Sequence, residues 1–147
     1  MIENIVNRIK SITKSNLYTW VEEYLEANKS MLVRDIQNRM QRGESVHDVN
    51  DVIGEYASEA YMMFKQRMNP LAGGDVDLFL EGDLQRFLTI EKRSKNIFKI
   101  YSKDEKYKKL AEQYGKEQFG LTEEQNTELM TDIHTYLIEK IFEKILK

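Results

Sequence analysis

Four carboxylates gather within nine residues of this sequence, at Asp75, Asp77, Glu81 and Asp83. If residues 76–80 form a strand, Asp75 and Asp77 point to the same face, because side chains alternate along a strand. Carboxylates in this arrangement can hold a hard cation such as Mg²⁺ for phosphodiester hydrolysis. No histidine or second carboxylate cluster stands at a recognisable spacing to complete such a site. A solvated strand face with turn residues explains the same carboxylates without chemistry.

Other signatures of catalysis are missing from the sequence. His47 lies in a polar connection and His134 lies beside an apolar stripe, and neither has the H-x-x-x-H or H-E-x-x-H spacing of a zinc site. There is no G-x-S-x-G, Walker or G-x-G-x-x-G motif. The chain has no cysteine, which excludes disulfides and thiolate sites. An enzyme would therefore have to build its site from residues scattered in the sequence, and we expect no metal, cofactor or small-molecule ligand.

A basic stretch at residues 91–109 is the other candidate for a working surface. It carries eight basic and three acidic residues, a local charge of +5 in a chain of net charge −3. Lysines interleaved with aromatic side chains can contact a nucleic-acid backbone. Lysines also protect exposed strand edges from unwanted pairing, and the specific partner is then an acidic protein surface. The candidate interface comprises Lys92, Arg93, Lys95, Phe98, Lys99, Tyr101 and Lys103.

The first half of the chain has the periodicity of helices. Apolar residues recur every three or four positions over residues 2–12, and Ser15 or Asn16 is expected to cap a second helix that ends at Gly43. A third helix is expected from about Asn50 to Met68, because the residue before Pro70 disfavours helical geometry. Its apolar stripe is predicted from Val52, Ile53, Tyr56, Ala60, Met63 and Phe64.

The pattern then changes from helix to strand. Pro70, Gly73, Gly74 and Gly82 are predicted as the structural turn residues, on either side of a strand at 76–80. Alternating residues at 87–92 and 97–102, separated by a turn containing Asn96, indicate an antiparallel hairpin. A short helix is expected at about 104–114, before Gly115. Thr122 and Gln125 have the spacing of a capping box for a long final helix, which we expect to pack on the sheet or on a neighbouring subunit.

These patterns predict an α+β fold that is predominantly helical. We expect one domain over residues 1–147, with a helical part at 1–68, a hairpin region at 75–103 and C-terminal helices at 104–147. The N-terminal residues lack the features of a secretory signal, and no apolar run reaches the eighteen or so residues of a membrane span. We therefore expect the chain in the cytoplasm, with no membrane partner.

The stretch from Ile53 to Gln125 resembles proteins of tailed bacteriophages. It has a helix bearing tyrosine and lysine, then N-P, then V-D-L and a glycine turn, then the hairpin, Y-G and F-G-L. More distantly, the layout resembles the virion-morphogenesis and tail-completion proteins of phage necks, whose turn corresponds to Leu80–Leu84 and whose hairpin corresponds to Phe87–Tyr101. Two departures are Glu81, where that family usually has threonine, and "YKKLAEQYG", where it often has a short tyrosine-alanine signature.

This resemblance implies a structural, non-enzymatic protein in a head-to-tail connector, neck or tail-completion ring. Its partners would be other copies of itself, the portal or connector, and tail proteins, within a virion assembled in the host cytoplasm. The hypothesis places Lys92, Arg93 and Lys95 against an acidic face of a neighbouring subunit or the portal, or in a lumen through which DNA passes. The main rival hypothesis is a nucleic-acid-binding accessory protein that uses the same residues 91–109. The third is a metal-dependent hydrolase built on Asp75, Asp77 and Asp83.

Overall fold

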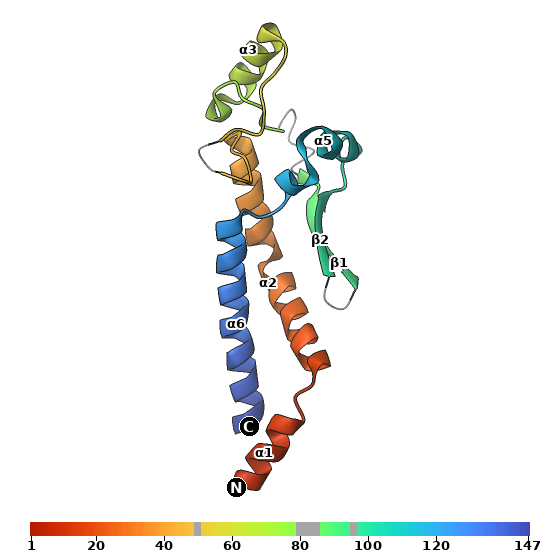
Figure 1. Cartoon of the computed structure of the whole chain (residues 1–147), viewed down its shortest axis with the longest axis vertical. Coiled ribbons are helices and arrows are strands. Elements are labelled where there is room, and N and C mark those ends of the chain that lie inside the picture. Colours follow the sequence, from red (N-terminus) through yellow and green to blue (C-terminus); the bar gives the residue numbers. More distant parts are fainter. Residues whose placement is uncertain (49–50, 79–85, 95–96) are drawn as a thin grey trace. The chain divides into compact units, whose positions relative to one another are not determined.

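A computed structural model describes residues 1–48, 51–78, 86–94 and 97–147, and it confirms a mostly helical α+β fold (Figure 1). The elements are α1 (Ile2–Lys10), α2 (Lys14–Gln41), α3 (Glu59–Met68), η1 (Pro70–Ala72), β1 (Leu88–Ser94), β2 (Ile97–Ser102), α5 (Tyr107–Tyr114), η2 (Lys116–Phe119) and α6 (Glu123–Leu146). Contacts divide the chain into two compact units, where unit 1 is residues 1–29 with 125–147 and unit 2 is residues 30–124.

Unit 1 is a pair of antiparallel helices extended by α1. Tyr24 of α2 and Tyr136 of α6 have ring centroids 5.3 Å apart, and Lys144 Nζ donates to Asn16 Oδ1 over 3.4 Å. Since position 24 meets 136 and position 16 meets 144, the two helices run in opposite directions. The predicted cap of α2 is corrected to Thr13, whose hydroxyl accepts the Asn16 amide while Asn16 Oδ1 accepts the Thr13 amide.

Unit 2 has a core that joins five segments of the chain. Its buried side chains come from α2, from the two connections that flank α3, from β1 and from η2; they are Ile36, Met40, Ile53, Val76, Leu78, Leu88 and Phe119. Phe119 is fully buried, and its ring lies edge-on to Tyr107 at 4.7 Å between centroids. The short helices α5 and η2 therefore close the core by means of aromatic packing.

The predicted hairpin is confirmed. β1 and β2 are antiparallel, with Leu88 opposite Ser102 and Ile90 opposite Ile100, and the register shifts between Lys92 and Ser94. Leu88 and Ile90 are buried, and Ile100 packs on the same core. One face of the hairpin is thus fixed to unit 2, and alternation turns the other face outward.

The third helix is shorter than predicted. It starts at Glu59, where Ser58 Oγ accepts the Tyr61 amide as an N-cap. The preceding residues bond to distant backbone instead: Ile53 N donates to Gly43 O, and Val76 N donates to Gly54 O. These long-range bonds replace the local bonds of a helix, and they were not visible in the local periodicity of the sequence.

The turn after α3 follows the prediction, whereas the strand after it does not. Pro70 begins η1, and Gly73 and Gly74 have φ of 59° and 91°, which favour glycine. Residues 76–78 are not a strand, because the φ of 53° at Leu78 is incompatible with extended backbone, and Val76, Asp77 and Leu78 are all buried instead of alternating. The rest of that predicted strand, Gly82 and the turn at Asn96 lie outside the described residues.

Over the described parts of the chain, no helix is both long enough and apolar enough to cross a membrane.

Candidate functional site

The outward face of the hairpin is organised around the ring of Tyr101. Arg93 Cζ lies 5.4 Å and Lys99 Nζ lies 5.0 Å from the centroid of this ring. Cations over an aromatic face are attracted by its quadrupole. Neither Arg93 nor Lys99 forms an ion pair with a carboxylate of the described residues. Both therefore offer positive charge to an anionic partner.

Glu91 partly neutralises this face. Tyr101 Oη donates to Glu91 Oε2 over 2.7 Å, and Lys103 Nζ lies 3.1 Å from Glu91 Oε1. The Tyr101 hydrogen bond and then Lys103 lower the pKa of Glu91, while acceptance by Glu91 raises the pKa of Tyr101. Lys103 is thus paired within the chain, which leaves Arg93 and Lys99 as the available cations among the described residues of this face.

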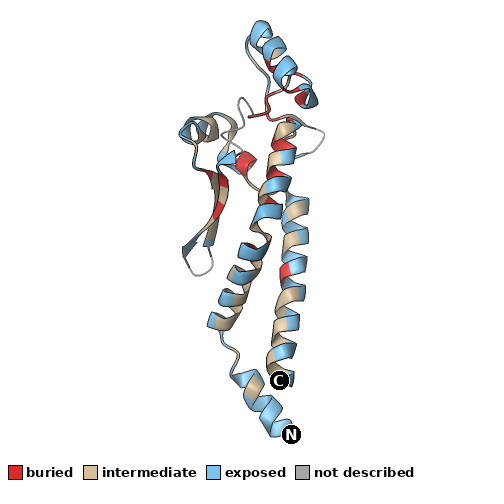
Figure 2. Ribbon diagram, turned by 180° about the vertical axis from the view of Figure 1, so that it is seen from behind, coloured by how far each residue is buried: buried red, intermediate tan, exposed pale blue. Residues whose placement is uncertain are grey.

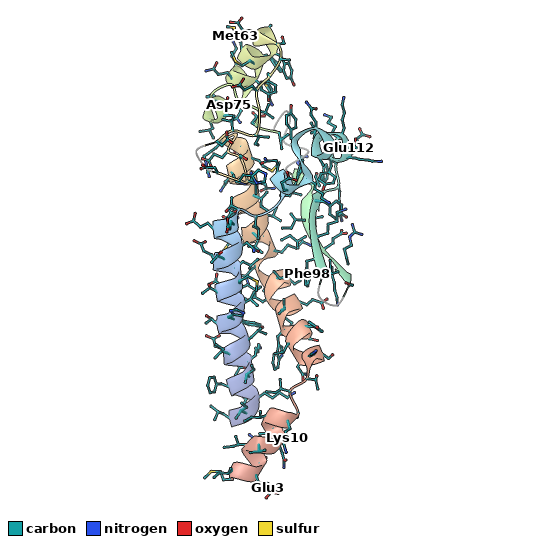
Figure 3. All side chains as sticks on the ribbon, in the orientation of Figure 1. Glu3, Lys10, Met63, Asp75, Phe98 and Glu112 are labelled. Atoms are coloured by element: carbon teal, nitrogen blue, oxygen red, sulfur yellow. The ribbon has the colours of Figure 1, made fainter. Side chains whose placement is uncertain are left out.

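Two of the remaining predicted interface residues, Lys92 and Phe98, lie on the other face of the hairpin. Lys92 and Phe98 are opposite each other in the register, on the side of the hairpin that also carries Ile90 and Ile100. Phe98 is half-buried, and Figure 3 labels it on the second strand. Lys95 lies outside the described residues. The structure therefore divides the predicted interface between two faces.

Titration tests the Glu91 cluster. The pKa of Glu91 is lower in the folded chain than in the unfolded chain. Ionised Glu91 therefore stabilises the fold above the unfolded pKa, and this stabilisation is lost as pH falls through the folded pKa. We expect the carboxyl carbon of Glu91 to titrate below the ordinary value of about 4.3 when followed by NMR. The variant Tyr101→Phe should raise that midpoint, because it removes the strongest hydrogen bond. An unchanged midpoint in Tyr101→Phe would show that the hydrogen bond from Tyr101 does not lower the pKa of Glu91.

Asp77 is an internal ion-pair partner rather than a surface carboxylate. Its Oδ1 lies 2.8 Å from Lys65 Nζ, and its Oδ2 accepts Asn69 Nδ2 over 2.9 Å. Tyr56 Oη donates to the same carboxylate over 3.3 Å, and this side chain is 1% exposed. Asp75, which is labelled in Figure 3, is in contrast half-buried, and burial followed by Glu55 raises its pKa.

The carboxylates of the hydrolase hypothesis therefore do not share one open face. Asp77 is enclosed by donors from α3 and its flanks, Asp75 faces another environment, and Asp83 lies outside the described residues. Within the described parts of the chain, no three carboxylate, histidine or cysteine side chains are placed to hold a metal ion. The contacts of Asp77 with Lys65 and Asn69 instead hold α3 to the segment that follows it.

The buried face of α3 is the reverse of the predicted stripe. Lys65 is its buried side chain, whereas Tyr61, Met63, Phe64 and Met68 are between 43% and 49% exposed. Figure 3 shows Met63 on the outside of the helix. Lys65 is turned inward because Asp77 provides a buried counter-charge, which compensates for the desolvation of its ammonium group. Because Lys65 faces inward, Met63 and Phe64 of the predicted apolar stripe are exposed.

A second buried network surrounds Arg39, which the sequence analysis did not single out. Its guanidinium donates to the carbonyl oxygens of Glu44, Gln118 and Gly120, over 2.9 Å for Glu44 and 3.2 Å for Gly120. Burial lowers the pKa of Arg39 to about 10, with nearby Glu44 opposing, so the group is charged at neutral pH. These three carbonyl oxygens bind one planar guanidinium group, which holds α2 and η2 together. We call this arrangement the Arg39 clamp.

Gln118 extends this clamp. Its side-chain oxygen accepts the Val46 amide over 2.9 Å, and its side-chain nitrogen donates to Ser45 Oγ over 3.2 Å. Beside it, Val46, His47, Asp48 and residues 122–124 line a depression. His47 Nε2 lies 3.6 Å from Glu117, and both side chains are mainly exposed. The polar residues that line this depression are exposed or half-buried.

Comparison of the chain with models of protein families, with curated proteins and with solved structures found no match.

Proposed function

We propose that this chain is a structural protein of a tailed-bacteriophage particle, at the head-to-tail connector, neck or tail-completion ring, which works through protein–protein contacts. Two independent arguments support the proposal. The resemblance of residues 53–125 suggests the particle, and the exposed surfaces of the chain suggest the mode of action. The proposal includes no enzymatic step.

The observation that carries the proposal is the amount of apolar surface that each unit leaves uncovered. In unit 1, side chains of α1 and α6 such as Ile2, Phe142 and Leu146 are 79%, 57% and 73% exposed. In unit 2, Phe64 and Leu71 are 46% and 65% exposed, on α3 and η1. Extended exposed apolar patches mark surfaces that bind other proteins, ligands or membranes. The hairpin adds Arg93 and Lys99, which can set the register of a charged contact.

Gene disruption in the phage that encodes the chain tests this function. If the chain joins head and tail, the disrupted phage should yield DNA-filled heads and separate tails when lysates are viewed by electron microscopy. A plasmid copy of the gene should restore joined particles. Joined, infectious particles without the plasmid would overturn the proposal.

A nucleic-acid-binding role is the second candidate, favoured by Arg93 and Lys99, for which the described residues provide no carboxylate partner. Under this alternative, anisotropy with labelled duplex DNA would show binding that weakens as salt rises. The double variant Arg93→Glu, Lys99→Glu would make the plot of log K against log salt concentration shallower, reducing the magnitude of its slope by about 2. Under the structural proposal, DNA binding is weak and this variant acts on assembly. Arg34→Glu, Arg67→Glu, at exposed positions of α2 and α3, is the charge control, because it changes the net charge by the same amount outside residues 91–109.

A further inference from the structure

Two rows of apolar side chains in unit 1 lie uncovered. On α1, Ile2, Ile5, Val6 and Ile9 have the spacing of one helical face and are between 36% and 79% exposed. On α6, Ile138, Phe142 and Leu146 follow one another every fourth residue and are between 54% and 73% exposed. We call these the α1 row and the α6 row.

The α6 row is not the face by which α6 packs on α2. That face contains Ile133, which is 7% exposed, and Tyr136, which contacts Tyr24. Phe142 is nine residues after Ile133, about two and a half helical turns, and therefore lies on the opposite side of α6. Figure 2 shows α6 mostly in pale blue and tan, and Ile133 is its buried residue. The helix is thus apolar on two sides, and unit 1 covers one of them.

The α1 row belongs to a helix that unit 1 alone supports poorly. Throughout unit 1 the chain is described, and α1 contains no buried residue there. Its polar tether is a bond from Arg8 Nη1 to the carbonyl of Ile145, over 2.9 Å. Isolated helices shorter than about 12–15 residues are marginal in water, and α1 has 9 residues. Its stability therefore calls for another apolar surface.

We propose that a second copy of this chain covers both rows, with the α1 row of one copy packed on the α6 row of the other. The rows match in length, since seven and eight residue steps at 1.5 Å per residue give about 10 Å and about 12 Å. Unit 1 has seven basic and eight acidic side chains, a charge of 7 − 8 = −1, so two copies repel each other little.

Charge complementarity favours this pairing over contact between two α6 rows. Glu139 and Glu143 border the α6 row on one side, whereas Lys10 borders the α1 row at its C-terminal end, where Figure 3 labels it. An antiparallel α1 brings Lys10 toward these glutamates and sets its positive N-terminus near the C-terminal end of the other α6. Two antiparallel α6 rows would instead place acidic borders together.

A contact between unlike surfaces has a consequence for symmetry. Each copy carries one α1 row and one α6 row, so two copies can exchange both contacts around a twofold axis, or successive copies can continue head to tail and close a ring. This inference rests on the proposed function for its context, but the isolated chain tests it without any phage component.

The experiment is sedimentation velocity of the full chain and two variants, alone and mixed. Variant A is Ile2→Asp, Ile5→Asp, where carboxylates near a helix N-terminus leave the helix intact. Variant B is Ile138→Lys, Phe142→Lys, where lysines near a helix C-terminus do the same. The controls are Asn4→Asp and Asn126→Lys, which each place one charge of the same sign on the same helix outside the rows. Circular dichroism checks that every chain is folded.

We expect the unchanged chain and both controls to associate, and variants A and B alone to associate at least about tenfold more weakly, since a buried charge without a partner is costly. An equimolar mixture should recover a complex of one A and one B, because A keeps the α6 row and B keeps the α1 row. A monomeric unchanged chain, normal association of A, or no complex in the mixture would each overturn the inference.

Two further results separate this inference from its rivals. Flotation with anionic phospholipid vesicles that is lost in A and kept in B would assign the α1 row to a membrane surface and overturn it. A chain that is monomeric alone yet needed for joined particles would overturn self-association while leaving the proposed function standing.

Discussion

Asp77→Ala should lower the free energy of unfolding of unit 2 by about 3–5 kcal/mol, because it leaves the buried ammonium of Lys65 without a counter-charge. Both side chains are at most 3% exposed, so water does not screen the pair. Asn69 Nδ2 and Tyr56 Oη lose an acceptor in the same variant. Urea unfolding followed by circular dichroism measures the effect, and hydrogen exchange of the β1–β2 amides assigns it to unit 2.

The controls for this prediction differ in burial and in pairing. Asp75→Ala, two residues earlier, removes a half-buried carboxylate whose pKa is raised, and it should change stability little. The double variant Lys65→Met, Asp77→Leu removes both charges and should recover part of the loss, because apolar residues can replace a buried pair. If Asp77→Ala and Asp75→Ala were equally mild, the internal ion pair would not be a stabilising feature of unit 2.

Arg39→Met should lower the free energy of unfolding by about 2–4 kcal/mol, since buried carbonyls that lose their donors each cost about 1–3 kcal/mol. The carbonyls of Glu44, Gln118 and Gly120 lose their common donor. The loss is partly offset because methionine removes a buried charge. We also expect a local effect, namely faster hydrogen exchange of the amides in η2 and of the Val46 amide, which donates to Gln118.

Arg42→Met is the matched control for Arg39. Arg42 lies three residues later on the same chain segment, and its guanidinium makes two bonds to the carboxylate of Glu44, at 2.8 and 3.1 Å. Its side chain is 49% exposed, and exposed ion pairs contribute about 0–1 kcal/mol. A larger loss from Arg42→Met than from Arg39→Met would show that the surface pair, and not the buried clamp, holds this region.

Local signals in the sequence were enough for the elements whose bonds are local. The hairpin strands, Pro70, the Gly73–Gly74 turn, the end of α5 and the start of α6 follow from alternation, capping and backbone preference. Helix α3 begins nine residues later than predicted, at 59 instead of about 50, because Ile53 and Gly54 bond to distant backbone. Long-range pairing of this kind leaves no periodicity to detect.

The candidate site was predicted less fully for a similar reason. The lysines of the hairpin identify a charged surface, but the register decides that Arg93 and Lys99 lie over Tyr101 while Lys92 does not share that arrangement. Lys65 and Asp77 each look like solvent-exposed charges in sequence. Their separation of twelve residues hides the contact that buries both, and it inverted the expected faces of α3.

Quantitative mass spectrometry of purified phage particles tests the central claim most directly. The structural account predicts that peptides of this chain remain with particles through density-gradient purification, at several copies for each portal ring. Peptides that are abundant in the lysate and missing from purified, infectious particles would contradict it.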